Sequence, residues 1–135
     1  MEGNKKKILI VDDDGFLLDM YAFKFSQNNF EVYTFMEGEA VLAKLKEGIN
    51  PDIILMDITM PGMDGFEVLE NINNNNLSPN SIKIILSNKS QQADIDRGNK
   101  LGVAGYIIKA NSTPTEVINE VAEILEKNSL LKKDK

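Results

Sequence analysis

The chain has 135 residues, of which 42% are hydrophobic and 27% charged, and its formal net charge at pH 7 is −6. This size and composition are typical of one globular domain with a single core. The acidic balance argues against direct nucleic-acid binding, which depends on clustered Lys and Arg. The absence of Cys and His excludes disulfides, metal sites built from these side chains, and nucleophilic catalysis by either of them.

The first residues show no sorting signal. Lysines at positions 5 to 7 precede an apolar stretch of only four residues, Ile8 to Val11. A secretory signal peptide has a longer apolar core, and a membrane span needs roughly 20 apolar residues. We therefore expect the protein to stay in the cytoplasm without a membrane anchor.

Apolar runs that favour strands alternate with helical patterns along the whole chain. In chain order, the pattern predicts a strand at Lys7–Val11, a helix at Gly15–Gln27, a strand at Phe30–Phe35, a helix at about Glu37–Glu47, a strand at Asp52–Asp57, a helix from Gly65 to about Asn73, a strand at Ile82–Leu86, a helix at Gln91–Leu101, a strand at Ala104–Lys109 and a helix from Thr115 to about Asn128. Five β–α units with nearly continuous apolar strands indicate an α/β domain whose parallel sheet is covered by helices on both faces. We expect a single domain over residues 1–135, with its core at about 5–128 and a frayed tail at 129–135.

Polar residues follow the apolar part of most of the expected strands. In an open parallel sheet the working site lies beyond the carboxyl ends of the strands. The residues found there are Asp12, Asp13 and Asp14, then Asp57, Ser87 and Lys109. A hard cation such as Mg²⁺ suits an acidic cluster of this kind, and a carboxylate can act as a nucleophile towards a phosphoryl group.

Four segments carry a family resemblance. ILIVDDD, ILMDITMPGMDGFE, IILSN and GYIIKA, in this order and spacing, resemble the receiver domain of two-component response regulators. The resemblance extends from about Lys5 to Asn128 and is closest to stand-alone, CheY-like receivers. It implies the flavodoxin-like (βα)5 fold, a doubly wound parallel sheet of order 2-1-3-4-5.

The resemblance also implies a signalling role. A partner histidine kinase or histidine phosphotransfer protein would donate a phosphoryl group to this chain. The surface formed by the fourth helix, fifth strand and fifth helix would then change shape and act on a downstream protein target. On this interpretation the chain is not an enzyme, beyond accepting the phosphoryl group and losing it again.

By position, the resemblance makes Asp57 the phosphoryl acceptor. It implies that Asp12, Asp13 and Asp57 bind a divalent metal together with the backbone carbonyl of Thr59. The expected metal is Mg²⁺, with Mn²⁺ as an alternative, because such cations bind through a few carboxylates and phosphate oxygens.

Three further positions match residues that contact the phosphoryl group, or respond to it, in the family. Ser87 takes the place of the switch hydroxyl, Tyr106 of the switch aromatic and Lys109 of the invariant lysine. Two neighbouring residues depart from the family pattern. Asn88 stands where a small residue is usual, and Ala110 stands where the family has a proline with a cis bond, so the geometry of the Lys109–Ala110 peptide is open.

Two other acids have a structural interpretation. Asp14 directly precedes a predicted helix, which favours a helix N-cap over a third metal ligand. Asp64, in the sequence PGMDG, is expected in a turn or at a helix cap.

The first predicted helix has an apolar stripe that faces away from its core side. Phe16, Met20 and Phe23 share this stripe at helical spacing. Exposed apolar patches often mark partner sites, and the resemblance favours docking of the phosphodonor here. Wide burial of the helix and self-association are the alternatives.

Rival functions remain open at this point. A receiver-shaped adaptor that is never phosphorylated has the same fold. A phosphohydrolase with an aspartate nucleophile needs a second acid and a cap insertion, and a flavin carrier needs a phosphate loop rich in Gly and hydroxyls after the first strand. The sequence also leaves open whether the protein is a monomer or a phosphorylation-dependent dimer.

Overall fold

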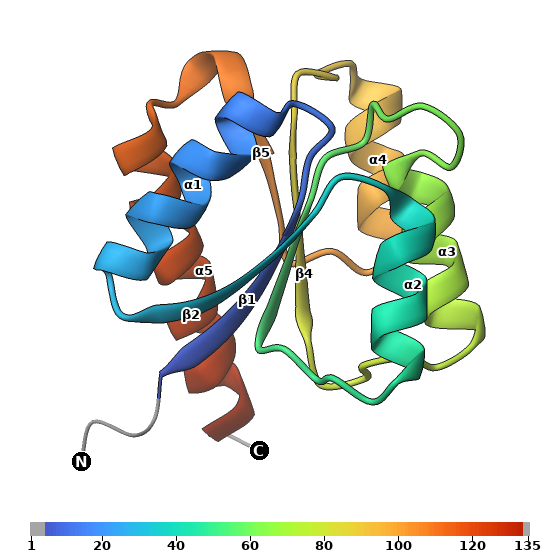
Figure 1. Ribbon diagram of the computed structural model, residues 1–135, viewed down its shortest axis with the longest axis horizontal. Coiled ribbons are helices and arrows are strands. Elements are labelled where there is room, and N and C mark those ends of the chain that lie inside the picture. Colours follow the sequence, from blue (N-terminus) through green and yellow to red (C-terminus); the bar gives the residue numbers. More distant parts are fainter. Residues whose placement is uncertain (1–4, 134–135) are drawn as a thin grey trace.

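Five parallel strands form the centre of the fold in the computed structural model, which describes residues 5–133. Their order is β2-β1-β3-β4-β5, and helices cover both faces of the sheet (Figure 1). This is the predicted flavodoxin-like, doubly wound arrangement. The elements are β1 (Lys6–Val11), α1 (Gly15–Gln27), β2 (Phe30–Phe35), α2 (Gly38–Lys46), β3 (Ile53–Met56), α3 (Gly65–Asn74), β4 (Ile82–Ser87), α4 (Gln92–Lys100), β5 (Gly105–Ile108), the short 3₁₀ helix η1 (Lys109–Asn111) and α5 (Pro114–Lys133).

The sheet is buried on both faces because its central strands carry continuous apolar runs, Ile8–Val11 in β1, Ile53–Met56 in β3 and Ile84–Leu86 in β4. Ile8 and Ile10 of β1 belong to a cluster shared with α1 and α5. Leu9 and Val11 point to the opposite face and belong to a second cluster shared with α2 and α3. Side chains alternate between faces along a strand, so a nearly continuous apolar run supplies both cores at once. Figure 1 shows α1 and α5 on one side of the sheet and α2, α3 and α4 on the other.

Side-chain caps at two helices agree with the sequence. Asp14 accepts hydrogen bonds from the backbone N–H groups of Phe16 and Leu17, both at 3.1 Å. Asp64 and Glu67 form a reciprocal capping box at the start of α3, with both hydrogen bonds at 2.9 Å. The predicted cap roles of these two aspartates are confirmed, and each fixes the point where a loop turns into a helix.

The end of α5 differs from the prediction. Helix and strand bounds otherwise differ by one residue at most, but α5 runs to Lys133 rather than to about Asn128. Residues 129–133, which we expected to fray, are helical, and residues 134–135 lie outside the described part of the chain. The segment after Asn128 contains Leu and Lys and neither Gly nor Pro, so nothing in it stops a helix. Within residues 5–133 no helix has the length and apolar character required to cross a membrane.

Two glycines occupy the same place in their helices but meet different surroundings. Gly15 and Gly65 are each the first residue of a helix after an aspartate cap. A Cβ on Gly65 would lie 2.2 Å from the carbonyl oxygen of Asp57 and 2.8 Å from Cα of Ile58. A Cβ on Gly15 would meet only the end of the Met36 side chain, at an ordinary 3.6 Å. Close approach of backbone to backbone therefore requires glycine at the start of α3 and not at the start of α1.

Substitution of these two glycines tests this close approach. Gly65→Ala should lower the free energy of unfolding by about 2 kcal/mol, because the start of α3 must move away from the backbone of Asp57 and Ile58. Gly15→Ala should leave it unchanged or raise it by about 0.5 kcal/mol through the lower entropy of the unfolded chain. Urea unfolding of both variants measures the difference. Equal effects would contradict the close approach at Gly65.

Candidate functional site

Three of the predicted site residues meet at the carboxyl edge of the sheet. The parallel register pairs Val11 of β1 with Met56 of β3, so the next residues, Asp12 and Asp57, lie side by side. Both are buried, at 1% and 5% exposure, whereas Asp13 is exposed. One carboxylate oxygen from each of the three acids lies within 4.8 Å of the others. Oxygen atoms at this spacing can bind one small, hard cation.

Lys109 reaches this acidic cluster from the end of β5. Its Nζ lies 2.8 Å from Oδ2 of Asp12 and 3.1 Å from Oδ2 of Asp57. The lysine side chain is 11% exposed, so both ion pairs are largely shielded from water. One cation therefore faces three carboxylates, and the cluster keeps an excess of negative charge.

The electrostatics of the site reflect this excess. Burial raises the pKa of Asp57 to about 6, Lys109 opposes that rise, and the neighbouring charge of Asp12 adds to it. Burial by itself would lower the pKa of Lys109, but its hydrogen bonds and charge attraction to Asp12 and Asp57 raise that pKa overall. Lys109 consequently stays protonated at neutral pH, and the Asp57 carboxylate is stabilised by any further positive charge.

An open cavity of about 310 Å³ adjoins Asp57. Thr59 lies at its rim, and the backbone N–H of Thr59 donates to Oδ1 of Asp57 at 3.3 Å. The volume is large enough for a phosphoryl group beside the acceptor. The residues that line it are Asp13, Asp14, Leu17, Asp57, Thr59, Asn88 and Lys109.

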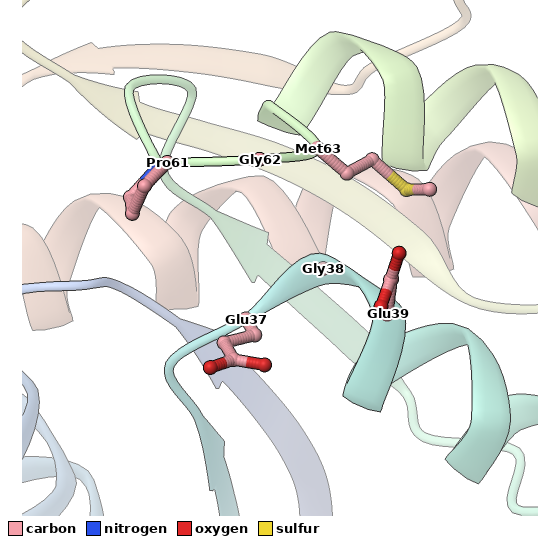
Figure 2. A pocket seen from close by; sticks show the side chains of 6 residues that line it. All are labelled: Glu37, Gly38, Glu39, Pro61, Gly62 and Met63. Carbon is pink, nitrogen blue, oxygen red and sulfur yellow. The ribbon is translucent and has the colours of Figure 1, made fainter.

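A second cavity, of about 300 Å³, lies between the start of α2 and the loop that precedes α3 (Figure 2). Its lining consists of Glu37, Gly38, Glu39, Pro61, Gly62 and Met63. The only charged groups among these residues are two glutamates, and none of the predicted site residues belongs to the lining. This cavity is separate from the candidate site.

Ser87 and Tyr106 are not among the residues that line this cavity, and both contact Lys89, in the loop between β4 and α4. The Ser87 hydroxyl accepts a hydrogen bond from the Lys89 N–H at 3.2 Å. The Tyr106 hydroxyl donates to the Lys89 carbonyl at 2.6 Å. Burial, with smaller contributions from Asp94 and Asp57, raises the pKa of Tyr106 to about 12, so this hydroxyl remains a donor. The two predicted switch residues thus bind the same residue, Ser87 at its N–H and Tyr106 at its carbonyl.

The apolar stripe of α1 faces outward, as expected. Phe16 is 77% exposed and Phe23 is 63% exposed, while Met20 is half-buried. The opposite side of α1 places Leu18 and Phe25 in the core. The stripe is thus available to a partner.

Two features of the site were not predicted from the sequence. Leu17, which packs against the core shared by α1 and α5, also lines the cavity. The side chain of Asn88 accepts a hydrogen bond from the Ala110 N–H at 2.9 Å. Asn88 and Ala110 are the two departures from the family pattern, and they directly follow Ser87 and Lys109. These positions were the available signal for a contact between them. The Lys109–Ala110 peptide bond is trans.

The pKa of Asp57, raised chiefly by burial, gives a pH-dependent prediction for Asp57→Asn in metal-free buffer. The ordinary pKa of this carboxyl is 3.8 and its folded-state pKa is about 6, so the folded protein binds more protons between these values. Stability that is present below pH 4 is therefore lost as the pH rises through 6. The variant, which does not titrate here, should melt several degrees above the wild type at pH 7, with a smaller difference at pH 4. Thermal unfolding at both pH values tests this, and a pH-independent difference would contradict it.

Comparisons with known proteins agree with the fold. The family described as "Response regulator receiver domain" matches residues 8–122. The chemotaxis protein CheY of Thermotoga maritima is 34% identical over 121 residues, which cover 87% of this chain and 98% of that protein. The transcriptional regulatory protein ResD of Bacillus subtilis is 33% identical over 126 residues, which cover 93% of this chain and 50% of ResD.

Some relatives are longer than this chain, which spans about half the length of ResD and of the B. subtilis regulator PhoP. Among solved structures, a CheY-like receiver domain protein from Methanospirillum hungatei superposes with a TM-score of 0.83 at 28% identity, covering 93% of this chain and 98% of that one. The family match covers most of the chain, and the fold and the acidic cluster agree with it. The chain belongs to the receiver domain family of two-component response regulators.

Proposed function

We propose that this receiver domain accepts a phosphoryl group on Asp57 from a phosphohistidine of a histidine kinase or a histidine phosphotransfer protein. A carboxylate oxygen of Asp57 attacks phosphorus, the bond from phosphorus to the donor nitrogen breaks, and its electron pair leaves with the donor imidazole. The observation that carries this proposal is the position of Asp57, which lines an open cavity and contacts Lys109. Lys109 is suited to bind a phosphoryl oxygen because its ammonium group is already directed at the acceptor.

The acidic cluster fits a divalent cation. Asp12, Asp13 and Asp57 offer oxygens within 4.8 Å of one another, and the ammonium group of Lys109 is paired with only two of these three carboxylates. We assign the metal ligands to these three acids and to the backbone carbonyl of Thr59, with Mg²⁺ as the cation and Mn²⁺ as a substitute. The bound cation would supply positive charge that lets an anionic phosphoryl group approach the acids.

Signal output would follow from the two side chains that contact Lys89. Movement of Ser87 towards a phosphoryl oxygen would pull on the Lys89 N–H, and Tyr106 would then lose or follow the Lys89 carbonyl. The adjoining helix α4 has only one buried residue, Gly98, so it is weakly anchored to the core. The surface of α4, β5 and α5 is therefore the region proposed to change and to bind a downstream protein.

Several further expectations stay predictions. These are the action of residues 1–135 as one receiver domain, the cytoplasmic location, the lack of direct nucleic-acid binding, and the choice between a monomer and a phosphorylation-dependent dimer. Docking of the phosphodonor on Phe16, Met20 and Phe23 is part of the proposal, and it is supported by the exposure of the two phenylalanines. A receiver-like adaptor that is never phosphorylated is the principal alternative.

Phosphorylation is tested with acetyl phosphate and Mg²⁺, followed by measurement of the intact mass. The wild type should gain one phosphoryl group, and Asp57→Asn should gain none. Asp13→Asn should slow the reaction by about tenfold or more, because it removes a metal ligand. Asp14→Asn is the matched control, since asparagine also caps helices and the rate should stay within about twofold of wild type. Lack of any mass gain, together with lack of beryllofluoride binding, would favour the adaptor.

The docking surface is tested with Phe23→Asp. The variant should take up the phosphoryl group from a phosphorylated histidine phosphotransfer protein about tenfold more slowly, because aromatic side chains contribute strongly at interfaces. Acetyl phosphate needs no docking surface and should react at the wild-type rate. Equal rates with the protein donor for variant and wild type would contradict docking on this stripe.

A further inference from the structure

One side-chain hydrogen bond connects two of the segments that border the Asp57 cavity. Oδ1 of Asn88 accepts the N–H of Ala110 at 2.9 Å and so joins the β4–α4 loop to η1. Asn88 directly follows Ser87, and Ala110 directly follows Lys109. The bond therefore connects the immediate neighbours of two residues that the proposed function brings to the phosphoryl group.

The bond lies where the sheet no longer holds the two segments together. The last register pair between β4 and β5 is Ser87 with Ile108. Beyond this pair, one segment leads to α4 and the other to α5. The Asn88–Ala110 hydrogen bond is the next link between the two segments. Asn88 also lines the cavity together with Asp57 and Lys109, so the link is at the site itself.

We propose that Asn88 is a positioning residue that holds Ser87 and Lys109 at a fixed spacing for the phosphoryl oxygens. This inference rests on the proposed phosphorylation of Asp57. A loop fixed before the reaction loses less conformational freedom when its hydroxyl and the lysine engage the same group. Small displacements of such groups have large effects on rate, so the loss of the link slows formation of the aspartyl phosphate.

The contact with Lys89 does not provide the same constraint. Tyr106 and Ser87 both bond to Lys89, one residue further along the loop, and Tyr106 comes from within β5 rather than from the segment that carries Lys109. A change in Tyr106 can therefore release the loop at Lys89 while Asn88 keeps Ser87 beside Lys109. Ser87 is thus the part of the loop that would bind the phosphoryl group, and Lys89 is the part that would transmit the conformational change to Tyr106.

The test is the rate of phosphorylation by acetyl phosphate with saturating Mg²⁺, for the wild type, Asn88→Ala, Ser87→Ala and the double variant. Asn88→Ala should lower the maximal rate about fivefold, with a smaller change in the half-saturating donor concentration. In the Ser87→Ala background the same substitution should have little effect, because its consequence passes through the serine. Asn111→Ala, an exposed asparagine in the same 3₁₀ helix, is the matched control and should react at the wild-type rate. Thermal unfolding confirms that each variant is folded.

The other outcomes are decisive as well. A faster reaction of Asn88→Ala would mean that Asn88 only obstructs the cavity, and an unchanged rate would mean that the link has no role in the reaction. An equal loss with and without Ser87 would also overturn the inference. If the wild type itself takes up no phosphoryl group on Asp57, the proposed function fails, and this inference fails with it. If the wild type is phosphorylated and Asn88→Ala reacts at the same rate, only the inference about Asn88 fails.

Discussion

The paired contacts of Lys109 with Asp12 and Asp57 determine how the carboxyl edge of the sheet is held together. Two buried carboxylates at adjacent strand ends repel each other, and burial adds to the cost of ionising both. The ammonium group of Lys109, at 2.8 and 3.1 Å, offsets part of this repulsion. Asp13 remains outside these ion pairs, on the exposed side of the cluster. These ion pairs allow the buried carboxylates to be tolerated in the fold. The three acids together still carry more negative charge than Lys109 balances.

The sheet makes this arrangement rigid. Its register is fixed by strands that are apolar on both faces, because a slip by one residue would exchange the two cores. Asp12 and Asp57 follow register-paired residues, so their separation is set by the sheet and not by a loop. Gly65 allows α3 to begin against the backbone of Asp57, which brings the helix start close to the acceptor strand. Loops supply the rest of the site, and they are where its movement is expected.

Sequence patterns predict those parts of the molecule that follow from local rules. Apolar runs and cap residues give the elements to within one residue at nearly every end, and the strand-end rule brings Asp12, Asp57 and Lys109 to one edge. The end of α5 was missed because helix ends without Gly or Pro carry no local signal. Hydrogen bonds such as Asn88 to Ala110 could not be predicted, since they depend on how two loops lie beside each other after the sheet has formed. The direction of Tyr106, towards Lys89, likewise depends on a loop whose path has no sequence pattern.

The same geometry indicates how phosphorylation of Asp57 would alter the surface of the protein. Conversion of Asp57 to its phosphate would add negative charge at the point where Lys109 already binds, so the lysine gains an acceptor without having to move far. Ser87, in contrast, accepts the Lys89 N–H with its hydroxyl oxygen and keeps its O–H proton for a phosphoryl oxygen, so a movement of the hydroxyl towards that oxygen would be carried to Lys89. The lysine and the backbone beside Ser87 are thus arranged before the reaction, whereas the Ser87 hydroxyl moves during it. Because the carbonyl of the same residue, Lys89, accepts from Tyr106, that change would reach β5 and the surface through one residue next to the weakly anchored helix α4.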